Sequence, residues 1–262
     1  MFGFIKKLLC GFDKDDRSEQ QREVSPEERE EFCKRLKEHT RETRKLVLVN
    51  GDAEPTPETK ISGTPWWPQG IPRPVCSSGH LMSFVMQVRL SDVPGLEKKE
   101  NSLLSFHYCD ECALEGKMAF GGFYEESDGF NVSIFHDTEA GVADGLGMVS
   151  DSIVEPYKVD FTTRQEVPSY IDTFEMFAEY PDDYPQGDDD YDENIYPGVI
   201  HIADAKLGGW PSWVQPSQYP DENSKFIAQL DWQLCPDTPW CNGYAYLFLK
   251  EDGSSDLVIQ TT

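Results

Sequence analysis

The stretches Lys60–Gln69, KISGTPWWPQ, and Lys206–Gln215, KLGGWPSWVQ, lie far apart in the chain and carry almost the same pattern. Each combines lysine, glycine, proline and two tryptophans within ten residues, a composition typical of a loop. Glycine supplies the turn, proline restricts the backbone, and tryptophan brings a large apolar surface. The repetition indicates that this loop belongs to the architecture of the chain.

The strands expected after each loop repeat as well. Each copy has a Phe-x-x-Gln element, and a further phenylalanine follows its first residue by 22 positions. Because residue types and one exact spacing recur in the same order, we interpret the pattern as an internal duplication. Two copies are too few for a solenoid, so we expect one pseudo-symmetric fold with a shared core. The repeated residues are Phe84, Gln87 and Phe106 in the first copy and Phe226, Gln229 and Phe248 in the second.

Short apolar and aromatic runs separated by Gly, Pro, Asn and Asp fill the chain from about residue 60, which favours strands joined by hairpins. Ser25, Pro26 and Glu28 occupy capping and first-turn positions of a helix that we expect to run to about Arg44. A weaker helical pattern spans residues 168–180. The expected fold class is α+β: an internally duplicated, mainly antiparallel β-sheet core with a preceding N-terminal helix.

The same patterns suggest a domain organisation. We expect an N-terminal amphipathic segment and helix over residues 1–45 and a duplicated domain over 46–262. The halves of that domain would span about 60–160 and 200–262, joined by an acidic linker over about 165–205.

Taken together, KISGTPWWP, MSFVMQVRL and SLLSFHYC, followed later by LGGWPSWVQ, FIAQLDW and GYAYLFL, resemble the YwqG-like family, a domain of unknown function of the DUF1963 type. The resemblance covers about residues 45–262. It implies a duplicated α+β fold and no established reaction. Some members are encoded near bacterial toxin systems, so the resemblance also implies a role as an immunity protein.

Charge is distributed very unevenly. The net charge is −25, and residues 118–262 hold 5 basic and 28 acidic side chains, a net charge of −23 in that part. Binding to phosphate needs clustered Lys and Arg, so this part is expected to repel nucleic acid. It is expected to attract a cationic protein, such as a basic toxin domain, although the charge also serves solubility.

The acidic linker contains no Lys or Arg over residues 165–205 and mixes carboxylates with tyrosines. Tyrosine supplies rigid contact area and carboxylates pair with basic groups, so we interpret its centre as a partner-binding surface; a solvated loop is the alternative. An EF-hand does not fit, because Glu193 and Val199 stand where Gly and Glu are needed, which leaves only an irregular calcium site open. The candidate partner-binding residues are Tyr180, Asp182, Asp183, Tyr184, Asp188, Asp189, Asp190, Tyr191, Asp192 and Glu193.

Two short motifs carry potential metal ligands. Cys109-x-x-Cys112 has the spacing of many zinc sites, and Cys76-x-x-x-His80 could complete a closed tetrahedral set. The resemblance implies a cysteine pair in each place, and the first pair is here a cysteine and a histidine. We expect one structural zinc ion that joins two loops, with ordinary thiols as the alternative.

Two functions remain open. The preferred one is a non-enzymatic, acidic protein-binding protein, and the alternative is an enzyme or small-ligand-binding protein with an aromatic cleft between the halves. In the alternative, Trp66, Trp67, Trp210 and Trp213 would line the cleft; their repetition favours a structural role, in which each covers the core of its own half. The sequence has no Gly-x-Ser-x-Gly, P-loop or Rossmann glycine pattern.

The N-terminus and the cysteines bear on location. Residues 1–12, MFGFIKKLLCGF, are too short for a transmembrane helix, so we expect a short helix docked on the core, with contact to a membrane surface as the alternative. An odd number of seven cysteines favours reduced thiols and a cytoplasmic protein.

Overall fold

The computed structural model describes residues 25–51, 54–96, 101–114, 131–137, 156–177, 204–231 and 243–261. In chain order, its elements are α1 (Pro26–Glu38), β1 (Arg41–Asn50), β2 (Lys60–Ile61), β3 (Ser83–Arg89), the 3-10 turn η2 (Leu90–Asp92), β4 (Ser102–Tyr108), α2 (Asp110–Leu114), β5 (Asn131–Asp137), β6 (Tyr157–Glu166), α3 (Tyr170–Met176), β7 (Lys206–Gly208), β8 (Lys225–Asp231), β9 (Gly243–Leu249) and β10 (Ser255–Thr261).

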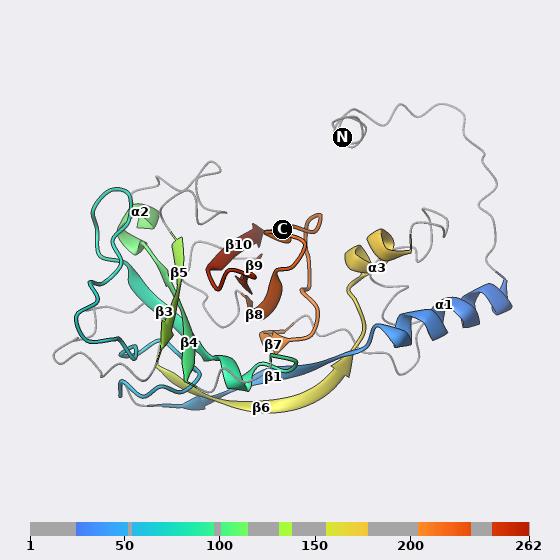
Figure 1. Cartoon of the computed structure of the whole chain (residues 1–262), viewed down its shortest axis with the longest axis horizontal. Helices are drawn as coiled ribbons and strands as arrows, with labels where there is room; N and C mark the ends of the chain where they lie inside the picture. The colour runs from blue at the N-terminus through green and yellow to red at the C-terminus, as the bar shows by residue number, and fades with distance from the viewer. Residues whose placement is uncertain are drawn as a thin grey trace.

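These strands form a single sheet in the order β10-β9-β8-β7-β1-β6-β2-β3-β4-β5, and every neighbouring pair is antiparallel (Figure 1). The long strands β1 and β6 pair along their whole length at the centre. On one side lie β2 to β5, here called the first arm, and on the other lie β7 to β10, the second arm. The predicted antiparallel sheet and preceding helix are thus confirmed.

The two arms match in local detail. Lys60 pairs with Gln87 in the first arm, as Lys206 pairs with Gln229 in the second. Each arm has a register shift two residues before that glutamine, after Phe84 or Phe226. Two successive residues with positive φ mark the end of the short strand in each arm. Ser62 and Gly63, at 58° and 77°, directly follow β2, and Gly208 and Gly209, at 63° and 76°, are the last residue of β7 and the one after it.

Gly209 is needed for a second reason besides its φ value. A Cβ atom there would lie 1.9 Å from Glu166 Oε1, in a place where the chain passes directly over a buried carboxylate. Only glycine fits such a close approach.

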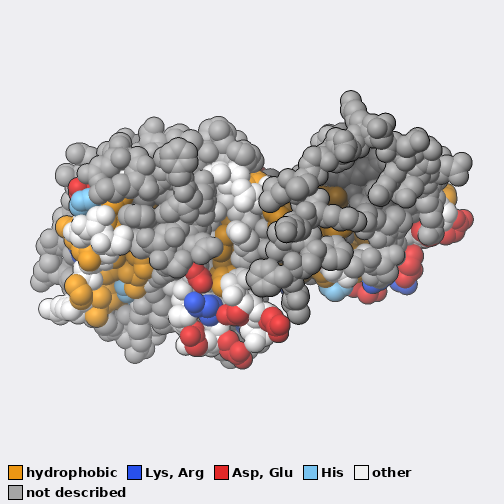
Figure 2. All heavy atoms as spheres, turned by 90° about the horizontal axis from the view of Figure 1, so that it is seen from above, with side chains coloured by type: hydrophobic (Ala, Val, Ile, Leu, Met, Phe, Trp, Pro, Cys, Tyr) orange, Lys and Arg blue, Asp and Glu red, His pale blue; other side chains and the backbone are white. Residues whose placement is uncertain are grey.

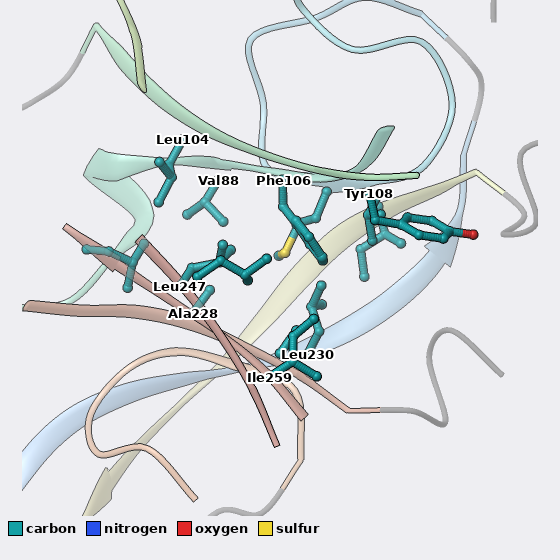
Figure 3. Close-up of a cluster of buried hydrophobic side chains, with 14 of the residues drawn as sticks. Val88, Leu104, Phe106, Tyr108, Ala228, Leu230, Leu247 and Ile259 are labelled. Carbon is teal, nitrogen blue, oxygen red and sulfur yellow. The ribbon is translucent and has the colours of Figure 1, made fainter. Parts of the chain in front are cut away.

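One hydrophobic core is shared by the arms. Figure 3 shows Val88, Leu104 and Phe106 of the first arm directed towards Ala228 and Leu247 of the second, and all five are buried. The sheet bends so that its edge strands, β5 and β10, contact each other. This arrangement matches the expected single fold with a shared core, because neither arm encloses these side chains alone.

Helix α1 begins as predicted, with a capping box between Ser25 and Glu28. Its apolar stripe is short: Phe32 and Leu36 are buried against Val167 and Phe177, beside α3 (Figure 1). The prediction that the helix continues to about Arg44 is wrong, because the chain turns after Glu38 and enters β1 at Arg41. Ladder bonds to β6 and β7 on both sides of β1 outweigh the helical preference of these polar residues.

Within the described part of the chain, the search for a helix long and apolar enough to cross a membrane found none. Helix α3 lies inside the range predicted for the second helix. The amphipathic segment 1–12 lies outside the described residues.

Candidate functional site

Four potential metal ligands come together at one end of the first arm. Cys76 and His80 lie in a tight turn before β3, in which the Cys76 N–H donates to the His80 carbonyl and the Gly79 N–H donates to the Cys76 carbonyl, both at 2.8 Å. Cys109 directly follows β4, and Cys112 lies in α2. Because β3 and β4 pair antiparallel, the start of one strand lies beside the end of the other.

The spacing of these side chains suits a tetrahedral ion. Their four candidate ligand atoms lie within 4.8 Å of one another. The Sγ atoms of Cys76 and Cys112 are 3.8 Å apart. His80 Nδ1 lies 3.4 Å from Cys112 Sγ and 3.6 Å from Cys109 Sγ. Bonds of ~2.3 Å to sulfur and ~2.0 Å to nitrogen around zinc imply ligand atoms about 3.5–3.8 Å apart, as found here.

Burial and hydrogen bonds act differently on the thiols. Burial opposes ionisation of Cys76, but N–H groups of His80 and Ser78 outweigh it and lower the pKa of Cys76 to about 7. Burial raises the pKa of Cys109 to about 12. A bound dication would supply the positive charge that ionises the buried thiols. The backbone N–H of Cys112 already donates to Cys109 Sγ at 3.4 Å, a contact that would stabilise negative charge on this sulfur once a metal ion is bound.

The predicted ligand set is therefore brought together, and it can bind a metal ion. Cys109 and Cys112 are fully buried, Cys76 is 4% exposed, and only the side chain of His80, at 25%, reaches the surface. Four protein ligands leave no open position for water or substrate, which is the arrangement of a structural site rather than a catalytic one.

The structure pairs the tryptophans differently from their order in the two loops. In the first arm, the backbone N–H of Trp66 donates to Gln87 Oε1 at 2.9 Å. In the second arm, the equivalent bond runs from the backbone N–H of Ser212 to Gln229 Oε1, at 2.8 Å. Trp66 thus corresponds to Ser212, and the tryptophan that the arms share is Trp67 in one and Trp213 in the other.

The two shared tryptophans fill the interior of their own arms. The ring centroid of Trp67 lies 4.5 Å from that of His136, in β5. The ring centroid of Trp213 lies 4.7 Å from that of Tyr246. The Trp213 ring also packs against Phe248, and both partners belong to β9. All four tryptophans of the repeated loops are at most 7% exposed. Neither of two cavities found among the described residues has Trp66, Trp67 or Trp213 in its walls.

Trp210 has no aromatic counterpart in the first arm, where Thr64 takes its place, and it borders a cleft. The cleft has a volume of 1080 Å³, and its walls include Arg41, Glu175, Trp210, Tyr219, Glu222 and Phe226. Arg41 stacks on the Trp210 ring at 3.4 Å. Burial lowers the pKa of Arg41, against the attraction of Tyr219, Asp172 and Glu166.

A buried ion pair beside this cleft was not predicted. The Lys206 ammonium donates to Glu166 Oε2 at 3.0 Å and to Ser212 Oγ at 3.2 Å, and both charged side chains are completely buried. Glu166 Oε1 also accepts a hydrogen bond from the backbone N–H of Trp210 at 2.6 Å. The lysine at the start of both repeated loops could have pointed to this ion pair. The partner of Lys206, however, lies in β6, a strand with no counterpart in the repeat.

A second buried polar group lies under Trp67. Ser105 Oγ is 3.0 Å from His136 Nε2 and 3.1 Å from His107 Nε2. Burial lowers the pKa of His107 to about 3 and that of His136 to about 4, so both rings are neutral at pH 7. His107 therefore acts as a neutral, hydrogen-bonded side chain of the core.

The candidate partner-binding residues from Tyr180 to Glu193 lie outside the described residues. Within the range expected for the acidic linker, residues 165–177 include the end of β6 and all of α3. Its buried acid Asp172 accepts from the Trp213 indole and from Tyr219, and burial raises the pKa of that carboxyl against these hydrogen bonds.

The sheet and the cluster define an antiparallel β protein with one Cys₃His group suited to a metal ion. The chain belongs to the family of domains of unknown function DUF1963, which matches residues 59–257. This span begins after β1 and contains all four residues of the cluster. No curated protein matches the chain significantly.

Proposed function

We propose that the protein is a non-enzymatic binding protein whose partner is a cationic protein. The observation that carries this proposal is the net charge of −23 over residues 118–262, with only 5 basic side chains in that part. A potential of one sign accelerates encounter with an oppositely charged surface. A basic toxin domain is one partner of this kind, in line with the immunity role that the family resemblance implies.

The described surface of the second arm supports this proposal. Next to the cleft lies a hollow of 620 Å³ with four exposed acids and one lysine in its walls. Figure 2 displays acidic side chains gathered along the lower edge of the molecule and around its right-hand end, where α1 lies. The four acids of the hollow are Asp221, Glu222, Glu251 and Asp252.

Reversing the charge of the acidic linker tests the proposal. Changing Asp188, Asp189, Asp190 and Asp192 together to lysine is expected to lower the association rate with the product of the neighbouring reading frame at least tenfold, on the order of known steering effects. The loss should shrink as salt is raised, because the Debye length falls from ~10 Å at 0.1 M to ~3 Å at 1 M. Stopped-flow measurements at several salt concentrations give these rates.

A matched control reverses four exposed glutamates of α1, Glu27, Glu30, Glu31 and Glu38, which changes the net charge equally. An equal slowing by both variants would mean that total charge matters and the linker is no docking surface. Absence of binding by the unchanged protein would reject the proposed partner.

The cleft beside Trp210 favours a second candidate function, the binding of a small ligand. Its volume of 1080 Å³ and its mixture of aromatic, acidic and basic walls suit a molecule with both polar and apolar parts. A fragment library screened by ligand-observed NMR should then give hits that Trp210→Leu weakens about tenfold, as expected when an aromatic contact of ~1 kcal/mol or more is lost. Trp66→Leu, in the other arm, should leave binding unchanged. Hits whose affinity changes with neither substitution would exclude the cleft.

We further propose that the cluster of Cys76, His80, Cys109 and Cys112 holds one structural zinc ion. Three sulfur ligands and one imidazole favour zinc over magnesium or calcium, which prefer oxygen. Zinc would join the turn before β3 to α2 and so tie these two short segments together at the end of the first arm.

The equivalent registers, bulges and positive φ values in the two arms support an origin by internal duplication. In this proposal β1 and β6 form the central pair to which each copy is joined. Later change added Trp210 and the ion pair to one copy and the metal ligands to the other.

A further inference from the structure

The two ring nitrogens of His80 face different groups. Nδ1 lies 3.4 Å and 3.6 Å from the sulfurs of Cys112 and Cys109, within the metal cluster. Nε2 lies on the opposite side of the ring, 3.7 Å from Glu111 Oε2. The geometry therefore makes Nδ1 the ligand atom and directs Nε2 towards a carboxylate.

We infer that Glu111 is a positioning residue for the metal centre, a role that rests on the proposed zinc site. When a metal ion takes the lone pair of Nδ1, the neutral imidazole of His80 carries its proton on Nε2. A carboxylate beside that N–H favours this tautomer, holds the ring in place and makes Nδ1 a stronger ligand. At 3.7 Å, Nε2 and Oε2 lie just beyond hydrogen-bond distance.

The placement of Glu111 suits this role. It lies in α2, between Cys109 and Cys112, so one short segment supplies two ligands and the carboxylate. His80 comes from the separate turn before β3 and is the ligand with the largest exposure. Glu111 thus restrains the one ligand that the core does not hold, while its own side chain is 63% exposed.

The test compares Glu111→Gln with Asp110→Asn, which removes the same charge one residue away. Asp110 Oδ1 accepts the Glu111 N–H at 3.0 Å, and asparagine keeps that acceptor. Competition with a chromophoric chelator at pH 7 gives the Kd for Zn²⁺. Glu111→Gln is expected to weaken binding about 10–100-fold, the usual effect of losing such a partner. Asp110→Asn should change it by no more than about threefold, as for a partly solvated charge outside the ligand set.

A second measurement separates positioning from folding. In ¹⁵N-histidine NMR spectra of the zinc-loaded proteins, the Nε2 proton of His80 should exchange with water faster after Glu111→Gln and at an unchanged rate after Asp110→Asn. Cobalt-loaded samples should keep a tetrahedral absorption spectrum in both variants, because all four ligands remain.

A third variant tests whether Glu111 acts on zinc binding through the imidazole of His80. In His80→Cys, which keeps four ligands without an imidazole, Glu111→Gln should weaken zinc binding no more than Asp110→Asn does. A large loss in that background, or equal losses from both changes in the wild-type background, would overturn the positioning role. So would an unchanged Kd after Glu111→Gln. If the wild-type protein binds neither zinc nor cobalt, the metal centre itself is rejected and Glu111 with it.

Discussion

Protein produced in zinc-supplemented medium is expected to carry one zinc ion per chain, and its removal should cost about 4 kcal/mol of stability when free zinc exceeds Kd 1,000-fold. The four ligand atoms already lie within 4.8 Å of one another, so little further ordering opposes binding. The three thiols and the imidazole contact one another at 3.4–3.8 Å in this mostly buried space, so an ion would replace weak sulfur hydrogen bonds with ligand bonds. Elemental analysis and thermal unfolding with and without a chelator measure both quantities.

Cys112→Ser should abolish tight binding and remove the stabilisation by zinc, because Cys112 is a fully buried ligand. Cys33→Ser is the matched control, since Cys33 lies in α1, far from the cluster in the chain. Metal-free wild-type protein whose thiols all react with a thiol reagent would contradict the site.

Lys206→Met is expected to lower the free energy of unfolding by about 3–5 kcal/mol, because it removes the ammonium that pairs with the buried Glu166 carboxylate. Both side chains are completely buried and 3.0 Å apart, so water cannot replace the lost partner. Burial lowers the pKa of Lys206, and the attraction of Glu166 opposes that shift. Urea denaturation of the two proteins gives the difference.

Lys45→Met provides a control on the neighbouring strand, since Lys45 pairs in register with Lys206 but forms its ion pair, with Asp204, at the surface. That change should cost no more than about 1 kcal/mol. Adding Glu166→Gln to Lys206→Met should restore much of the lost stability: glutamine keeps an acceptor for the Trp210 N–H and carries no charge. Similar costs for Lys45→Met and Lys206→Met would show that burial of the pair is unimportant.

Local signals predicted some elements well and missed others for a physical reason. The capping residues Ser25 and Glu28 marked the start of α1 correctly, because a cap acts within one turn. Strand β6 escaped notice, since most of its side chains are half-buried or exposed and include Lys158, Asp160 and Arg164. Tyr157, Val159 and Phe161 do alternate with polar residues and pack against the core, but the second half of the strand is polar, and its strand state depends on hydrogen bonds to β1.

By itself, the sequence determined the repeated loop, the Phe-x-x-Gln strands, the four metal-ligand residue types and the acidic charge. Each of these depends on residues close together in the chain or on composition, so it could be read without coordinates. Tertiary structure alone decided that Lys206 meets Glu166 and that Glu111 faces His80. Strand pairing and a shared core set these contacts, and they join residues whose separation in the chain follows no local period.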